Sequence, residues 1–174
     1  MHVICYGDSN TWGYDPRGFF GGRYDEPWPS LLPWKTENLG ENGREIPAFP
    51  VTFPENTDLL IVMLGTNDLL QGSGAEAAAK RMESFLPGIS WKPEKILLIA
   101  PPPMQLGQWV PGTWLIEESK ELTRQYEALS RRLGVRFADA GRWKIPLAFD
   151  GVHFTEEGHR AFAEGLMNYL NKGV

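Results

Sequence analysis

Two short apolar runs that stop abruptly in polar turns constrain the fold of this chain most strongly. Residues 3–6 lead into a turn that carries Ser9, and residues 59–64 lead into a turn that carries Asn67. A continuous apolar run of this length is typical of a strand covered on both faces, as in a parallel sheet. The two turns would then lie at the carboxyl ends of the strands, where open α/β sheets bind their ligands.

Strand-like and helix-like patterns alternate along the rest of the chain. Further strands are predicted at 35–39, 95–100 and 135–138, helices at 75–86, 115–133 and 156–170, a short helical turn at 28–34, and irregular connections at 15–30 and 41–57. This alternation predicts an α/β fold, in which a parallel sheet has helices on both faces. A chain of 174 residues fits a single domain over residues 1–174.

Charge and composition exclude several classes of partner. The net charge is −5 and the lysines and arginines are scattered, whereas a nucleic-acid-binding face requires them to cluster. No apolar run reaches the length of a membrane span. The first strand begins at once and leaves no room for a signal segment, and the single cysteine, Cys5, lies inside that strand as a small buried side chain. We therefore expect a cytoplasmic protein without nucleic-acid or membrane partners.

Four polar side chains supply the parts for acyl transfer. A serine hydroxyl is a weak nucleophile until a base takes its proton, so Ser9 needs a base within reach. Near the C-terminus, Asp150 and His153 stand three residues apart, close enough for the carboxylate to accept from the imidazole and fix its tautomer. Asn67 adds a side-chain amide that can donate to a negative oxygen.

Four short motifs, in this order, resemble those of a known family. They are Gly7-Asp8-Ser9, the glycine of Asn38-Leu39-Gly40, Gly65-Thr66-Asn67-Asp68 and Asp150-Gly151-Val152-His153. On these motifs the chain is similar to the SGNH hydrolases, a branch of the GDSL esterases and lipases, and most similar to small arylesterases and acyltransferases. The resemblance implies a three-layer α/β/α sandwich whose five-stranded parallel sheet has the flavodoxin-like order. One departure is Asn10, where the family has leucine, and we expect it to alter the pocket floor more than the chemistry.

The resemblance also implies roles for individual residues. Ser9 would be the nucleophile, His153 the base, and Asp150 the carboxylate that orients the imidazole. The oxyanion would be bound by the backbone N–H groups of Ser9 and Gly40 and by the side-chain amide of Asn67. Gly40 has the alternative reading of an ordinary turn glycine. This chemistry needs neither a cofactor nor a metal.

Aromatic residues predict the walls of the substrate pocket. The segments 15–30 and 101–114 are long loops that follow the catalytic turn and a strand end, respectively. The second carries Met104, Leu106 and tryptophans that are too apolar for a fully solvated loop. These side chains tuck onto the core, line an acyl pocket as a lid, or meet another copy of the chain in a homo-oligomer. We assign substrate binding to Trp12, Tyr14, Trp109 and Trp114.

A metal site is disfavoured by the spacing of its candidate ligands. Asp150, His153, Glu156 and His159 are conceivable ligands, but the two histidines are six residues apart, where a helical pair requires three or four. His159 is expected instead to be exposed or half-buried on the last helix. Chelators are therefore expected to leave activity intact.

Three further polar residues are predicted to have structural rather than catalytic roles. Arg44 lies four residues beyond Gly40 and could border the site, but we favour a surface arginine. Asp8 and Asp68 are expected to hold turns rather than to take part in the chemistry.

The leading hypothesis from the sequence is a serine esterase that hydrolyses small, short-acyl esters, acetyl esters above all. A chain of this size has little room for a deep acyl tunnel, which favours short acyl groups. The same residues would support acyl transfer to an alcohol or thioester hydrolysis. An alternative from another class is a non-catalytic module that binds a glycan or acyl ligand. The joint presence of Ser9, Asn67 and His153 argues against that alternative.

Overall fold

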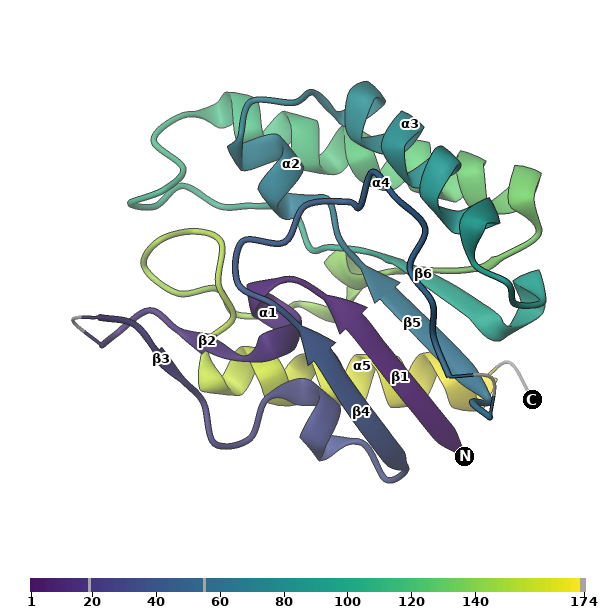
Figure 1. The fold of residues 1–174 in the computed structure, drawn as a ribbon. Coiled ribbons are helices and arrows are strands. Elements are labelled where there is room, and N and C mark those ends of the chain that lie inside the picture. Colours follow the sequence, from purple (N-terminus) through teal and green to yellow (C-terminus); the bar gives the residue numbers. More distant parts are fainter. Residues whose placement is uncertain (19, 55, 173–174) are drawn as a thin grey trace.

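A five-stranded parallel sheet forms the centre of the protein over residues 1–18, 20–54 and 56–172, which the computed structural model describes (Figure 1). The strands are β1 (His2–Gly7), β4 (Lys35–Gly40), β5 (Leu59–Met63), β6 (Ile96–Ala100) and β7 (Arg136–Asp139). Their order in the sheet is β4-β1-β5-β6-β7. This is the flavodoxin-like order, so the predicted fold class is confirmed.

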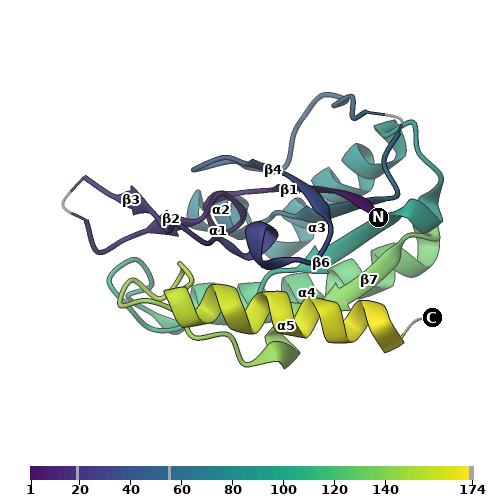
Figure 2. The same cartoon turned by 90° about the horizontal axis from the view of Figure 1, so that it is seen from below.

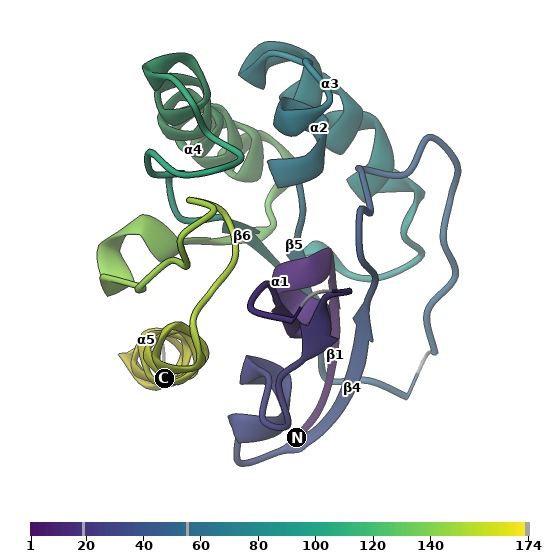
Figure 3. The ribbon, with the colours of Figure 1, turned by 90° about the vertical axis from the view of Figure 1, so that its left-hand side faces the viewer.

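Helices cover both faces of this sheet. Figure 3 shows α3 (Ala75–Phe85) and α4 (Thr113–Leu133) on one side, and α5 (Glu156–Lys172) on the other. A 3₁₀ turn (Trp28–Leu31) packs against α5, where the sequence predicted a longer helical turn. The predicted helix and strand ends differ from the observed ones by one or two residues at most ends.

The alternation of side chains in the strands explains why their sequences are apolar throughout. In β1, Ile4 and Tyr6 join the core under α3 and α4, whereas Val3 and Cys5 join the core under α5. Successive strand residues point to opposite faces, and here both faces are covered. Cys5 is fully buried, as the sequence predicted.

One predicted loop contains regular structure. Within the segment expected to be irregular at 15–30, β2 (Tyr14–Asp15) pairs antiparallel with β3 (Gly22–Arg23). Figure 2 shows this hairpin projecting beyond the end of the sheet, with α5 running along one face. The carboxylate of Asp15 stabilises the turn by accepting from the backbone N–H and the guanidinium of Arg17.

The turn after β1 requires glycine at its first position. A Cβ on Gly7 would lie 2.1 Å from Thr11 Oγ1 and 2.8 Å from the carbonyl oxygen of Met63. The lack of a side chain at Gly7 lets α1 (Ser9–Trp12) begin right after β1. The N-cap of α1 is Asp8, which accepts from the N–H of Asn10 at 3.0 Å. This geometry places Ser9 in the first turn of α1.

His159 is buried, so the expectation of an exposed or half-buried residue was wrong. It belongs to the apolar stripe of α5, which continues with Phe162, Leu166 and Leu170. Its Nδ1 accepts from the backbone N–H of Trp28 at 3.3 Å. Burial, together with the nearby His153, lowers the pKa of His159 from 6.5 to about 4, so the ring is neutral at neutral pH.

The described helices include none that combines enough length and apolarity to cross a membrane.

We predict that His159 makes the protein less stable in acid. Its pKa is about 4 when folded and 6.5 when free, so the unfolded chain binds the extra proton first. The free energy of unfolding keeps the full contribution of the neutral His159 above pH 6.5. It falls as the pH drops toward 4, by about 3 kcal/mol in total. Urea unfolding of the wild type and of His159→Gln between pH 7.5 and 4 measures this difference, because other titrating groups cancel. Parallel pH profiles for the two proteins would contradict it.

Candidate active site

Ser9, His153 and Asp150 lie in one hydrogen-bonded row at the carboxyl end of the sheet. Ser9 Oγ is 3.0 Å from His153 Nε2, and His153 Nδ1 is 2.7 Å from Asp150 Oδ2. The three residues are 7%, 2% and 1% exposed, respectively. The structure thus brings together three residues that the sequence predicted to act in concert.

The hydrogen bonds of Asp150 fix the state of the imidazole. Because Asp150 accepts from Nδ1–H, the neutral ring leaves Nε2 free to accept from the Ser9 hydroxyl. The other carboxylate oxygen accepts from the backbone N–H groups of Val152 and His153, each at 2.9 Å. Burial raises the pKa of Asp150, but the bonds from the His153 ring and from these two N–H groups outweigh it and hold the pKa below its usual value. Asp150 is therefore a carboxylate at neutral pH.

The segment that carries His153 is a tight turn leading into α5. The N–H of Ala148 donates to the carbonyl of His153 at 2.7 Å, which closes the turn. Thr155 is the N-cap of α5, since its hydroxyl accepts from the N–H of Gly158 at 2.9 Å. The sequence predicted this cap, and it fixes where His153 stands relative to the helix.

The predicted loop 101–114 packs against this turn. Met104 is buried in the core, whereas Leu106 is exposed and Trp109 is 46% exposed. Three backbone N–H groups of the loop donate to carbonyls of the His153 segment: Gln105 to Gly151 at 3.0 Å, Gln108 to Phe149 at 3.1 Å and Trp109 to Asp150 at 3.0 Å. The loop thus joins the core at Met104, as one of the three predicted arrangements required, and it contacts the His153 segment at its other end. Its role as the lid of an acyl pocket stays a prediction.

Two of the four predicted substrate-binding residues flank the imidazole. The ring centroids of Tyr14 and Trp109 lie 4.6 Å and 4.9 Å from that of His153. Trp12 instead lies under the guanidinium of Arg23, at 5.1 Å, and Trp114 stands half-exposed in the first turn of α4. A substrate-binding role for all four residues stays a prediction.

The residues predicted to bind an oxyanion have different environments. Ser9 is the first residue of α1, where helix N–H groups have no intrahelical acceptor. Asn67 lies in the first turn of α2 (Thr66–Leu70), and its Nδ2 donates to the carbonyl of Arg44 at 3.1 Å. An NH₂ group has two hydrogens, so the second can serve another acceptor.

The N–H of Gly40, which was predicted to bind an oxyanion, has a partner within the protein. Its N–H already donates to Asn38 Oδ1 at 2.9 Å. A Cβ on Gly40 would lie 2.1 Å from the backbone nitrogen of Trp12, so glycine is needed here for the close approach of β4 to α1. The alternative reading of Gly40 as a structural glycine is the one that the geometry favours.

Arg44 is a structural residue beside the site, and its prediction as a surface arginine was wrong. Its guanidinium donates to the carbonyl of Gly7 at 2.9 Å and to that of Leu39, and lies over the ring of Tyr6 at 4.3 Å. It therefore joins the ends of β1 and β4. Its bond to Gly7, 37 positions earlier in the chain, could not be predicted from the local sequence.

Asp8 and Asp68 hold turns, as predicted. Asp8 caps α1, and burial raises its pKa to about 6. Asp68 accepts from the N–H of Ile46 at 3.1 Å and from the guanidinium of Arg81 at 2.7 Å, and so ties α2 to the preceding loop and to α3.

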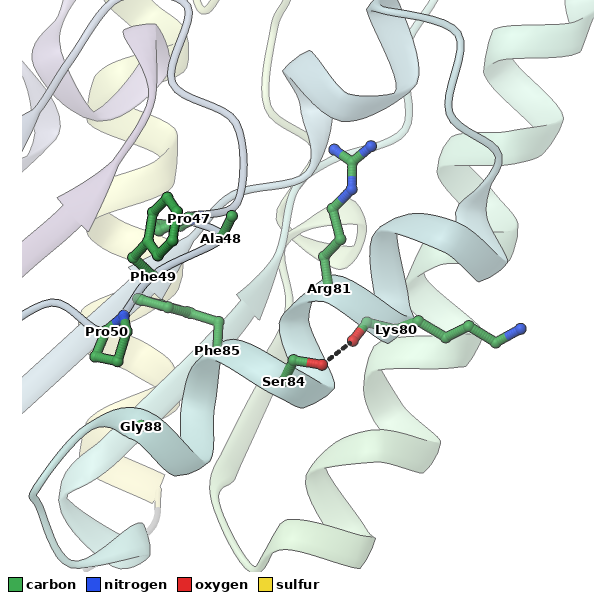
Figure 4. Close-up of a pocket in the computed structure, with 9 residues that line it drawn as sticks. All are labelled: Pro47, Ala48, Phe49, Pro50, Lys80, Arg81, Ser84, Phe85 and Gly88. Atoms are coloured by element: carbon green, nitrogen blue, oxygen red, sulfur yellow. Dashed lines mark hydrogen bonds between the residues drawn. The ribbon is translucent and has the colours of Figure 1, made fainter.

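Two other kinds of site are relevant to the chemistry, a cluster of metal ligands and a hollow beside Ser9, His153 and Asp150. Within the described residues, no three His, Cys, Asp or Glu side chains gather so that they could hold a metal ion. A hollow of about 340 Å³ lies between residues 47–50 and α3, and neither Ser9, His153 nor Asp150 lines it (Figure 4).

Comparison with known proteins agrees with the fold and the site. Residues 5–161 match the model of the GDSL-like lipase/acylhydrolase family. A proposed arylesterase from Agrobacterium tumefaciens is 30% identical, with a TM-score of 0.81 and 99% of each chain covered. A carbohydrate acetylesterase family member from Sinorhizobium meliloti is 28% identical, with a TM-score of 0.79 and 99% of each chain covered. An aryl esterase from M. smegmatis, at 24% identity, a TM-score of 0.79 and 99% coverage of each chain, shares the fold. A search of curated protein sequences finds no match.

The fold, the site and these comparisons define a carboxylic ester hydrolase. The chain belongs to the GDSL-like lipase/acylhydrolase family, which confirms the resemblance seen in its four motifs.

We predict that Asp150→Asn lowers kcat for p-nitrophenyl acetate by roughly 10⁴-fold, because an amide can bind the wrong imidazole tautomer and cannot stabilise the imidazolium. Initial rates measure the effect. The matched control is Asp58→Asn at the opposite end of the sheet, where the carboxylate accepts from the N–H of His2. Wild-type kcat in folded Asp150→Asn would contradict the assignment.

Proposed function

We propose that the protein is a serine esterase that hydrolyses small, short-acyl esters through an acyl-enzyme on Ser9. The observation that carries this proposal is the continuous row from Ser9 Oγ to His153 Nε2 at 3.0 Å and from His153 Nδ1 to Asp150 Oδ2 at 2.7 Å. A nucleophile, a base and an orienting carboxylate in this arrangement are what acyl transfer to serine requires.

Each half of the reaction uses the same base. His153 Nε2 takes the hydroxyl proton as Ser9 Oγ bonds to the acyl carbon, and it then gives this proton to the departing alkoxide, which leaves as the alcohol. Water enters in the second half: His153 takes its proton as the water oxygen bonds to the acyl carbon, and returns the proton to Ser9 as the acid departs. Asp150 stays ionised throughout and stabilises the imidazolium.

The negative oxygen of each tetrahedral intermediate needs fixed donors. The N–H of Ser9 at the start of α1 and the second amide hydrogen of Asn67 are our candidates. The bond from Asn67 to the carbonyl of Arg44 holds the amide in place before substrate arrives. Preorganised donors of this kind do not have to reorient during the reaction.

The surroundings of His153 support small esters with an apolar or aromatic part. The rings of Tyr14 and Trp109 both contact the imidazole, and Ser9 is only 7% exposed. Structures described as an arylesterase and a carbohydrate acetylesterase family member are similar to this chain. Aryl esters and acetyl esters are therefore the substrate classes that we propose.

Acyl transfer to an alcohol is the second candidate. The partly exposed ring of Trp109, 4.9 Å from that of His153, places apolar surface beside the proposed triad, and such surface disfavours water as the acyl acceptor. Thioester hydrolysis would use the same residues. The ratio of transfer product to acid in the presence of added ethanol separates transfer from hydrolysis. A non-catalytic binding module is disfavoured because it would have no use for the intact row.

The cellular setting of the protein stays a prediction of the sequence. This applies to its cytoplasmic location, to the lack of nucleic-acid and membrane partners, and to self-association through the apolar loop that contains Leu106 and Trp109.

We predict that Ser9→Ala abolishes hydrolysis and that p-nitrophenyl acetate and butyrate are better substrates than the octanoate, because a chain of 174 residues has little room for a deep acyl tunnel. Initial rates across this series test acyl length, and mass spectrometry of the wild type after mixing with substrate tests for the acyl-serine. The matched control is Ser90→Ala at an exposed serine. Turnover by Ser9→Ala at the wild-type rate would overturn the proposed function.

We also predict that Asn67→Ala lowers kcat by roughly 10²-fold to 10³-fold, the usual effect of removing one oxyanion donor. The KM should change much less, because the donor acts on charge that develops in the transition state. Steady-state rates of the variant and of Asn168→Ala, a control on the exposed face of α5, measure both parameters. An unchanged kcat would exclude Asn67 as a donor.

A further inference from the structure

Asn10 directly follows Ser9, and both ends of its side-chain amide bond to the segment that carries His153. Its side chain lies in α1 and is 3% exposed. The sequence predicted an effect on the pocket floor, because the family's name-giving motif has leucine here. The structure shows a different arrangement, in which the side-chain amide bonds to the backbone on both sides of His153.

Two hydrogen bonds make this connection. Asn10 Nδ2 donates to the carbonyl of Val152 at 3.1 Å, and Asn10 Oδ1 accepts from the N–H of Phe154 at 2.9 Å. Both bonds are buried and span more than 140 positions of sequence. A carboxamide can make this pair because it carries a donor and an acceptor side by side.

The backbone around His153 depends on these two bonds. From the N–H of residue 152 to the N–H of residue 154 there are five consecutive polar groups, and all have partners. Asp150 accepts from the N–H groups of 152 and 153, and Ala148 donates to the carbonyl of 153. Asn10 supplies the partners of the remaining carbonyl and N–H. Buried backbone groups without a partner are destabilising, so the turn needs this side chain to keep its shape.

We propose that Asn10 is a positioning residue that holds His153 at the distance from Ser9 that proton transfer requires. The inference rests on the proposed function, because it concerns the same nucleophile and base. Asp150 sets the orientation of the imidazole, and Asn10 sets the position of the His153 backbone relative to α1. Asn10 and Ser9 are adjacent in one capped helical turn. The two bonds of Asn10 therefore fix the position of His153 relative to Ser9.

Changes at Asn10 affect the two bonds differently. Alanine and leucine remove both, and leucine also keeps a side chain of similar size, so lost packing does not explain its effect. Aspartate keeps the acceptor for Phe154 but directs a negative oxygen at the carbonyl of Val152. We expect all three to loosen the turn and lengthen the contact between Ser9 Oγ and His153 Nε2.

The test compares Asn10→Leu and Asn10→Ala with the wild type, at a temperature where each is folded by circular dichroism. We expect kcat for p-nitrophenyl acetate to fall by roughly 10²-fold, the order of loss that a 1 Å misplacement produces, with little change in KM. We also expect the downfield proton NMR resonance of the His153 Nδ1–H to broaden, because a looser turn lets water exchange that proton.

Asn38→Ala is the matched control for Asn10→Ala. Asn38 Nδ2 donates to the carbonyl of Thr11 and Asn38 Oδ1 accepts from the N–H of Gly40, each at 2.9 Å. This amide therefore makes the same kind of backbone pair and also supports α1, but it bonds to β4 instead of the His153 turn. Asn38→Ala should lower the melting temperature while the Nδ1–H resonance stays sharp and kcat is largely kept.

Two results would overturn the positioning role. One is a wild-type kcat and a sharp resonance in Asn10→Leu. The other is an equal loss of kcat in Asn10→Ala and Asn38→Ala, which would show that the effect acts through α1 stability. Failure of the proposed function has a separate sign, turnover by Ser9→Ala, and the resonance still reports on the Asn10 bonds in that case.

Discussion

The buried carboxylate of Asp150 is the constraint on which the rest of the site depends. A charge removed from water is destabilising unless donors surround it. Asp150 accepts from the N–H groups of Val152 and His153 and from the ring of His153, and these three bonds bend the chain into the turn before α5. The loop at 105–109 braces the same turn through its backbone N–H groups. The charge, the turn and the direction of the imidazole therefore form a single unit, and loss of one member disturbs the others.

Most of the fold could be predicted from the sequence because the sheet is covered on both faces. Strands such as β5 are apolar at every position, since alternate side chains enter two different cores. The strand order came only from the motif resemblance, because the spacing of strands does not specify which edges meet. The hairpin of β2 and β3 was missed because each strand has two residues, too few to show an alternating pattern.

Some residues of the site could be predicted from their local sequence, and others could not because they depend on distant partners. Ser9, Asp150 and His153 could be predicted because each stands in a short motif that is visible in the sequence, although distant groups such as Asn10 also hold the turn around His153. Arg44 and His159 could not, because each also bonds to a group far away in the sequence, the carbonyl of Gly7 and the N–H of Trp28, respectively. At Gly40 the need for a close approach was real, and the neighbour that requires it is α1.

The separation of Ser9 and His153 along the chain has a consequence for how activity is acquired. Ser9, the proposed nucleophile, belongs to the first helical turn, and His153, the proposed base, precedes the last helix, 144 positions later. Closing so long a loop requires the central sheet and the docking of α5 to be complete. Partly assembled chains and nascent chains still lacking α5 would therefore be inert, and hydrolysis would appear as the final event of maturation.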